Sequence, residues 1–92
     1  MKIKQIAEAI KTAMQQKLDC FKNYDYEVIK DSENKYYIKV FNTSSANVIT
    51  RSALLYIEDV LEVAENGMPC LIDCFVQSAN GRTEYVIVIY KK

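Results

Sequence analysis

The order of hydrophobic patterns along this chain repeats, and that order limits the folds it can adopt. A helical pattern followed by two strand patterns joined by a short turn runs from Lys2 to about Asn42, and again from about Thr50 to Tyr90. Helical stretches place apolar residues three and four positions apart, whereas half-buried strands alternate apolar and polar residues. Two such units in 92 residues predict a single domain covering residues 1–92.

The first unit predicts a helix over residues 2–18 and strands over residues 24–30 and 35–41. Asn23 is expected to adopt a left-handed conformation between the helix and the first strand. Residues 31–34 are rich in turn-forming side chains and should connect the two strands. One face of the helix carries its apolar residues: Ile3, Ile6, Ile10, Met14 and Leu18.

The second unit predicts a helix over residues 51–66 and strands over residues 70–77 and 84–90. Thr50 should cap the start of the helix with its side chain. We expect Gly67 to end the helix as a left-handed cap, with Pro69 preventing its continuation. The Asn80-Gly81 pair is the strongest short signal for a tight hairpin turn between the two strands.

These elements predict an α+β two-layer sandwich, in which a four-stranded sheet has both helices on one face. Strands 35–41 and 84–90 should be central, because the latter is apolar on both faces. Strand 24–30 carries the charges expected at a sheet edge. This arrangement would be a circular permutant of the ferredoxin-like fold.

Alternation within the strands divides their side chains between the two sheet faces. The helix-facing set is expected to be Tyr24, Tyr26, Val28, Tyr36, Ile38, Val40, Cys70, Ile72, Cys74, Val76, Tyr85, Ile87 and Ile89. The open face should then present Tyr37, Lys39, Phe41, Phe75, Val86, Val88 and Tyr90 near its centre, with Asp25, Glu27, Asp73 and Glu84 around them. An apolar, aromatic patch rimmed by charge is unusual to leave in water and indicates an interaction surface.

Three occupants of the open face remain in consideration. The first is a second copy of the chain in a symmetric homodimer, and the second is a different protein. The third is nucleic acid or a small ligand stacking on the aromatic side chains. Sheets that bind RNA are surrounded by Lys and Arg, whereas this face combines Lys39 with several acids. The residues therefore favour protein as the partner and make nucleic acid the weakest of the three.

The predicted second helix is acidic, with Glu58, Asp59, Glu62 and Glu65 and no basic residue after Arg51. Acids near a helix C-terminus are unfavourable for the helix dipole. One interpretation is neutralisation by lysines of the other helix, at Lys4, Lys11 or Lys17. The other is an acidic surface that binds a basic partner protein, as a phage-type inhibitor would by mimicking nucleic acid.

Composition argues against catalysis and against a bound cofactor or metal. The chain has no histidine and a formal net charge of zero, and it lacks a glycine-rich phosphate loop. Its odd number of cysteines, Cys20, Cys70 and Cys74, is typical of reduced thiols in a cytoplasm. Cys70 and Cys74 would lie about 13 Å apart along one strand, too far for a mutual disulfide, and are expected to be buried structural thiols. The start of the chain shows no signal peptide, so we expect a cytoplasmic protein. The lack of histidine and of a phosphate loop leads us to expect that it is not an enzyme.

Overall fold

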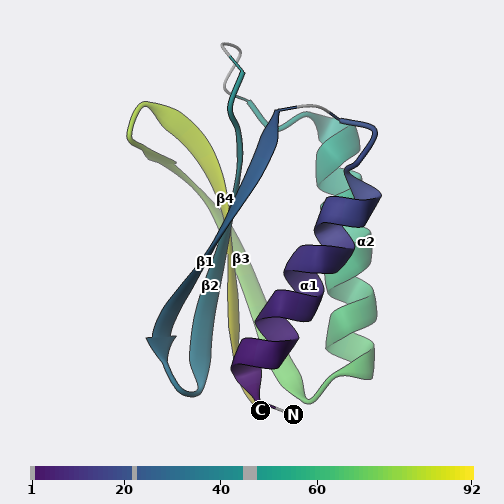
Figure 1. Ribbon diagram of the computed structural model, residues 1–92, viewed down its shortest axis with the longest axis vertical. Coiled ribbons are helices and arrows are strands. Elements are labelled where there is room, and N and C mark those ends of the chain that lie inside the picture. The colour runs from purple at the N-terminus through teal and green to yellow at the C-terminus, as the bar shows by residue number, and fades with distance from the viewer. Residues whose placement is uncertain (1, 22, 45–47) are drawn as a thin grey trace.

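The computed structural model describes residues 2–21, 23–44 and 48–92, and these residues form an α+β sandwich with the predicted element order (Figure 1). The helices and strands are α1 (Ile3–Lys17), β1 (Tyr24–Ser32), β2 (Lys35–Asn42), α2 (Arg51–Gly67), β3 (Cys70–Ala79) and β4 (Arg82–Lys91). Both helices lie on one side of the sheet (Figure 1). The predicted fold class is therefore confirmed.

The strand order of the sheet is β1-β2-β4-β3, and every neighbouring pair is antiparallel. This places β2 and β4 in the centre and β1 and β3 at the edges, as the strand composition predicted. It is also the order that results from moving the first strand of a ferredoxin-like chain to its end. α1 begins and β4 ends at the same end of the molecule (Figure 1), as such a permutation requires.

The hydrophobic core lies between the helix layer and the sheet. α1 contributes the fully buried Ile6, Ile10 and Met14, and α2 contributes Ile57. Such a stripe at three- and four-residue steps is what a helix needs to cover one sheet face. The helix-facing residues of the two central strands are buried as predicted: Tyr36, Ile38, Val40, Tyr85, Ile87 and Ile89.

Three local signals at the ends of elements are confirmed. Asn23 has a φ of 70°, in the left-handed region, directly before β1. Asn80 and Gly81 have φ values of 55° and 72°, the two positive angles that a type I′ hairpin turn requires. The Thr50 hydroxyl accepts a hydrogen bond from the Ala53 backbone N–H at 3.2 Å and so caps the start of α2.

The end of α2 differs from the prediction. Gly67 is the last helical residue instead of a left-handed cap, and Met68 follows in an extended conformation with a φ of −122°. The Met68 backbone N–H still donates to the Ala64 carbonyl at 2.8 Å. The cause is Pro69, because a residue that precedes proline is sterically pushed out of the helical region into extended geometry. The chain therefore leaves the helix without a left-handed residue.

A second difference concerns the outer part of β3. Cys74 and Val76 were expected to pack beneath the helices, but both are exposed, and Val76 retains 61% of its accessible surface. Their neighbour Cys70, on the same side of the strand, is buried as predicted. Toward its turn, the β3–β4 hairpin bends away from the helices (Figure 1), so the helices cover the beginning of β3 but not its end.

Candidate functional site

The residues assigned to the open face form one continuous surface, because the strand register places them side by side. Val86 of β4 pairs with Lys39 of β2 and with Phe75 of β3. In the next row, Val88 pairs with Tyr37 and with Asp73. Since side chains alternate between faces along each strand, these rows lie on the face opposite the helices, as the sequence predicted.

One half of this open face is apolar and accessible. We call it the apolar half, and its most exposed members are Ile29, Leu71 and Phe75, which are 38%, 39% and 46% exposed. They come from both edge strands, and the half-buried Tyr37 and Tyr90 lie between them on β2 and β4. Side chains from four strands therefore share one water-facing apolar surface.

The centre of the open face is less exposed than the sequence suggested. Phe41, Val86 and Val88 were expected to be accessible, but all three are buried within the single chain. Arg82 explains the burial of Phe41, because its guanidinium carbon lies 3.5 Å from the centroid of the Phe41 ring. Such stacking of a cation on a ring covers apolar surface while the charge stays hydrated.

The other half of the open face is organised around a buried carboxylate. Glu84 has no exposed surface, although the sequence placed it at the rim. It accepts hydrogen bonds from Gln77 Nε2 at 2.7 Å and from Arg82 Nε at 2.9 Å, and Lys39 Nζ lies 3.6 Å from Oε1. Arg82 also lies 3.5 Å from Glu27. We refer to these five residues as the Glu84 cluster.

The Glu84 cluster holds its central carboxylate in the ionised form. Hydrogen bonding from Gln77 lowers the pKa of Glu84 most, burial opposes this by raising it, and Arg82 and Lys39 lower it further. Among the described residues, no buried side-chain nitrogen or oxygen lacks a hydrogen-bond partner. The cluster thus presents a fixed, fully satisfied polar surface instead of a free base or nucleophile.

Sequence reasoning missed Gln77 and Arg82, and strand geometry is the signal that could have found them. Arg82 stands two residues before Glu84 on β4, so both side chains point to the same face. Gln77 is the cross-strand partner of Glu84 in the β3–β4 hairpin. Counting outward from the predicted Asn80-Gly81 turn gives this pairing, because a two-residue turn fixes hairpin register.

The acidic residues of α2 separate into two groups. Asp59 lies toward α1, where its carboxylate is 3.7 Å from Lys17 Nζ. Glu58, Glu62 and Glu65 are exposed, and among the described residues they form no ion pair within 4 Å. Of the lysines considered for neutralisation, Lys17 pairs with Asp59, whereas none pairs with the three glutamates among the described residues. We call Glu58, Glu62 and Glu65 the acidic stripe.

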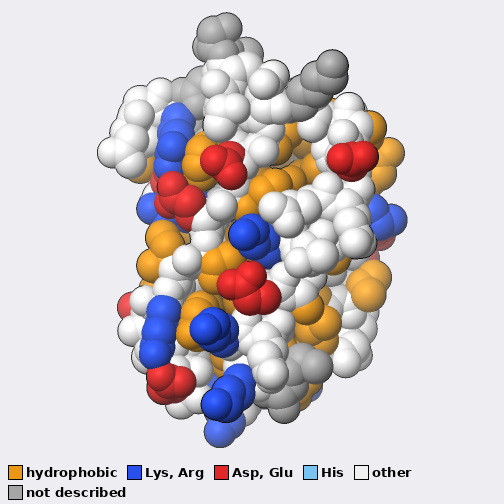
Figure 2. Space-filling model, in the orientation of Figure 1, with side chains coloured by type: hydrophobic (Ala, Val, Ile, Leu, Met, Phe, Trp, Pro, Cys, Tyr) orange, Lys and Arg blue, Asp and Glu red, His pale blue; other side chains and the backbone are white. Residues whose placement is uncertain are grey.

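Charges of both signs are mixed over the molecular surface. On the face drawn in Figure 2, Lys and Arg side chains alternate with Asp and Glu and with apolar patches. This agrees with the formal net charge of zero. A strong basic field, which supplies most of the affinity of nucleic-acid-binding proteins, is not present on that face.

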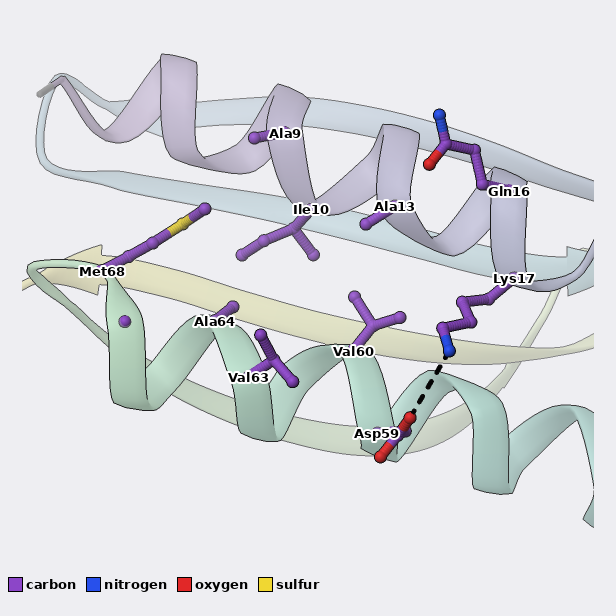
Figure 3. Close-up of a pocket in the computed structure, with 11 residues that line it drawn as sticks. Ala9, Ile10, Ala13, Gln16, Lys17, Asp59, Val60, Val63, Ala64 and Met68 are labelled. Carbon is purple, nitrogen blue, oxygen red and sulfur yellow. Dashed lines mark ion pairs between the residues drawn. The ribbon is translucent and has the colours of Figure 1, made fainter.

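A groove between the two helices is a hollow that the sequence did not indicate. Its volume is about 440 Å³, and Lys17 and Asp59 meet across one end of it (Figure 3). Small side chains on the facing helix surfaces, such as Ala9 and Ala13, leave this space unfilled (Figure 3). The lining is mostly apolar: Ala9, Ile10, Ala13, Gln16, Lys17, Asp59, Val60, Val63, Ala64, Gly67 and Met68.

The cysteines do not form a common site. Cys20 and Cys74 are exposed and Cys70 is buried, and all three are free thiols. The expectation of a buried thiol is confirmed for Cys70 and wrong for Cys74, which lies beyond the cover of the helices. Burial, and after it the carboxylate of Glu65, raises the pKa of Cys70. Within the described part of the chain, no three acidic or thiol side chains converge as metal ligands would.

Comparison of the chain with protein-family models, curated proteins and solved structures finds no match. Neither of the helices formed by the described residues combines the length and the apolar composition that crossing a bilayer requires. The features of this chain that bear on function are therefore the open face, the acidic stripe and the sheet edges.

Proposed function

We propose that the protein is a non-enzymatic binding protein whose open sheet face packs against a second copy of the chain. The observation that carries this proposal is the apolar half, where Ile29 on one edge strand and Leu71 and Phe75 on the other remain exposed on the same face. Burying such a surface against a partner is favourable by about 25 cal/mol per Å² of apolar area. The face is also open across the whole width of the sheet, because both helices lie on the other side (Figure 1).

A second copy suits this face because the surface carries both halves of a self-complementary interface. A two-fold axis brings the same patch of both subunits together. The apolar halves would then contact each other, and the Glu84 cluster, which contains Lys39 and Arg82 as well as Glu27 and Glu84, would form a polar rim. Two sheets packed in this way lie about 10 Å apart. We propose a cytoplasmic location, since the exposed thiols of Cys20 and Cys74 suit a reducing compartment.

A second candidate function is inhibition of a basic partner protein by the acidic stripe together with the nearby Asp59. The observation favouring it is that Glu58, Glu62 and Glu65 are exposed without ion-pair partners among the described residues. Like charges at this spacing cost stability, which a bound cationic surface would relieve. Nucleic acid or a small ligand on the open face is less favoured, because Phe41 is already stacked by Arg82.

Light scattering coupled to size-exclusion chromatography tests the homodimer. We expect the wild-type protein to be a dimer at micromolar concentration and Phe75→Asp to be a folded monomer, because the aspartate would be buried without a partner in the interface. Leu55→Asp is the matched control, since Leu55 is an exposed apolar residue of α2, on the opposite layer. A monomeric wild type, or dissociation by Leu55→Asp as well, would contradict the proposal.

A further inference from the structure

The two edges of the sheet differ in their protection against pairing with another strand. β1 carries charged residues along its length, and its register shifts between Lys30 and Ser32. Charges and bulges are the usual devices that prevent edge-to-edge association. β3 pairs with β4 in unbroken register from Cys70 to Ala79, and Asp73 is the one charged residue within it. β3 is therefore the unprotected edge.

β3 exposes apolar side chains on both of its faces. Val76 is exposed on the helix side, where the hairpin bends away from the helices, while Leu71 and Phe75 are exposed on the open face. Asp73 interrupts this surface little, because its carboxylate accepts a hydrogen bond from the Tyr90 hydroxyl at 2.9 Å. A long, regular and apolar edge strand is a template for the addition of another strand.

The hairpin geometry indicates which backbone groups of β3 point outward. Ala79 pairs with Arg82 across the two-residue turn, and residues flanking such a turn form a hydrogen-bonded pair. Hydrogen-bonded and non-hydrogen-bonded pairs then alternate along the strand. By this alternation Phe75 bonds to β4, whereas the N–H and C=O groups of Cys74 and Val76 face away from the sheet. These outward groups are the ones an added strand would pair with.

Two members of the acidic stripe, Glu58 and Glu65, lie beside this edge. Asp59 and Val63 of α2 are directed toward α1 (Figure 3), and at 100° per residue Glu58 and Glu65 lie on the opposite side of the helix. α2 packs over β3 while α1 packs over the other strands, so that opposite side overhangs the β3 edge. In agreement, Glu65 contributes, after burial, to raising the pKa of Cys70 at the start of β3.

We propose that the β3 edge binds an extended segment of another protein, which adds to the sheet as a fifth strand. Its side chains would alternate: basic residues on the helix side, beside the acidic stripe, and apolar residues on the open side, beside Leu71 and Phe75. A second copy of β3 is the wrong occupant, since a two-fold axis at this edge would place one acidic stripe against the other. The site uses the sheet edge and is distinct from the open-face dimer proposed above.

The test is titration of the full chain with a short synthetic peptide that alternates lysine and valine, followed by amide chemical shifts. We expect the largest shifts at β3 residues, and no binding of the matched peptide in which glutamate replaces lysine. Replacing Glu58, Glu62 and Glu65 together by Gln should weaken binding about tenfold, as expected for three solvent-exposed ion pairs. High salt should weaken it similarly.

A pair of substitutions at Val76 tests the backbone pairing. Val76→Pro removes an outward N–H without removing a bond to β4, so the fold should survive while peptide binding is lost. Val76→Thr keeps that N–H and should bind as the wild type does. Circular dichroism checks that both variants are folded. The proposal would be overturned if both peptides bound alike or if the chemical shifts changed only on other strands. It would also be overturned if Val76→Pro dissociated the dimer and Phe75→Asp did not.

Discussion

Arg82 lies with its guanidinium carbon 3.5 Å from the centroid of the Phe41 ring. The same side chain donates its Nε–H to the buried carboxylate of Glu84 at 2.9 Å. One arginine thus covers an aromatic ring and satisfies a buried charge on a face that has no helices. This contact limits the accessible apolar surface of the open face to the half around Ile29, Leu71 and Phe75.

Glu84→Gln should lower the free energy of unfolding by about 2 kcal/mol, within the range for disrupting a buried, charge-assisted hydrogen bond. The carboxylate accepts from donors on both of its oxygens, whereas an amide offers one oxygen and would direct its NH2 group at another donor. Urea unfolding measures the change. Glu27→Gln is the control, since Glu27 is exposed and should cost less than about 1 kcal/mol. If both variants lost the same free energy of unfolding, Glu84 would not be the residue that holds this cluster together.

The stability of the protein should decrease in acid through Glu84. Its pKa is lowered in the folded state, so its contribution is complete above the unfolded value of about 4.3 and is lost as the pH falls through the lower folded value. Urea midpoints measured between neutral pH and pH 3 should show this loss. The decline should be shallower in Glu84→Gln. Parallel declines in the two proteins would mean that other carboxylates cause the acid sensitivity.

Opposite faces of the sheet should respond differently to aspartate. Ile87→Asp should unfold the chain, because Ile87 is fully buried beneath the helices and an unpaired charge there costs at least several kcal/mol. Phe75→Asp should preserve the far-ultraviolet circular dichroism spectrum, since Phe75 is 46% exposed. Val88 is a less suitable probe of the open face than Phe75, as it is buried within the chain. Unfolding by Phe75→Asp with a folded Ile87→Asp would invert the assignment of the two faces.

Replacing each of the two glycines by alanine should change the free energy of unfolding in opposite directions. Gly81 has a φ of 72°, so Gly81→Ala should lower the free energy of unfolding by about 1 kcal/mol through backbone strain. Gly67 is helical, and a Cβ added there would meet nothing within 4 Å, so Gly67→Ala should raise it by up to about 1 kcal/mol. Thermal unfolding of both variants measures the difference. If Gly67→Ala instead lowered the free energy of unfolding, the result would favour the left-handed cap that the sequence predicted.

Local chemistry made most of the fold predictable. The Asn80-Gly81 turn, the Thr50 cap and the left-handed Asn23 each depend on neighbouring residues alone, and each is confirmed. The central position of β4 was also predictable, because its apolar residues on both faces require cover on both. These signals predicted the element order, and the apolar composition of β4 favoured the observed strand order without determining it.

The site was less predictable, because it depends on distances between elements. Whether Cys74 and Val76 are covered depends on where the β3–β4 hairpin bends away from the helices, and the alternation of apolar and polar residues along a strand does not indicate this. The burial of Glu84 depends on Gln77 and Arg82 lying on the same face in one register. The sequence placed Glu84 at the rim because it is charged, whereas these two partners hold it at the centre of a polar cluster.

Nuclear Overhauser effects between differently labelled copies in a mixed sample would show whether two copies pack through their open faces. We expect intermolecular effects from the Phe75 ring to the methyl groups of Ile29 or Leu71, which are exposed members of the apolar half. Phe75→Asp should abolish them. Intermolecular effects that instead involve Val63 in the groove between the helices, or their complete absence at millimolar concentration, would contradict this packing.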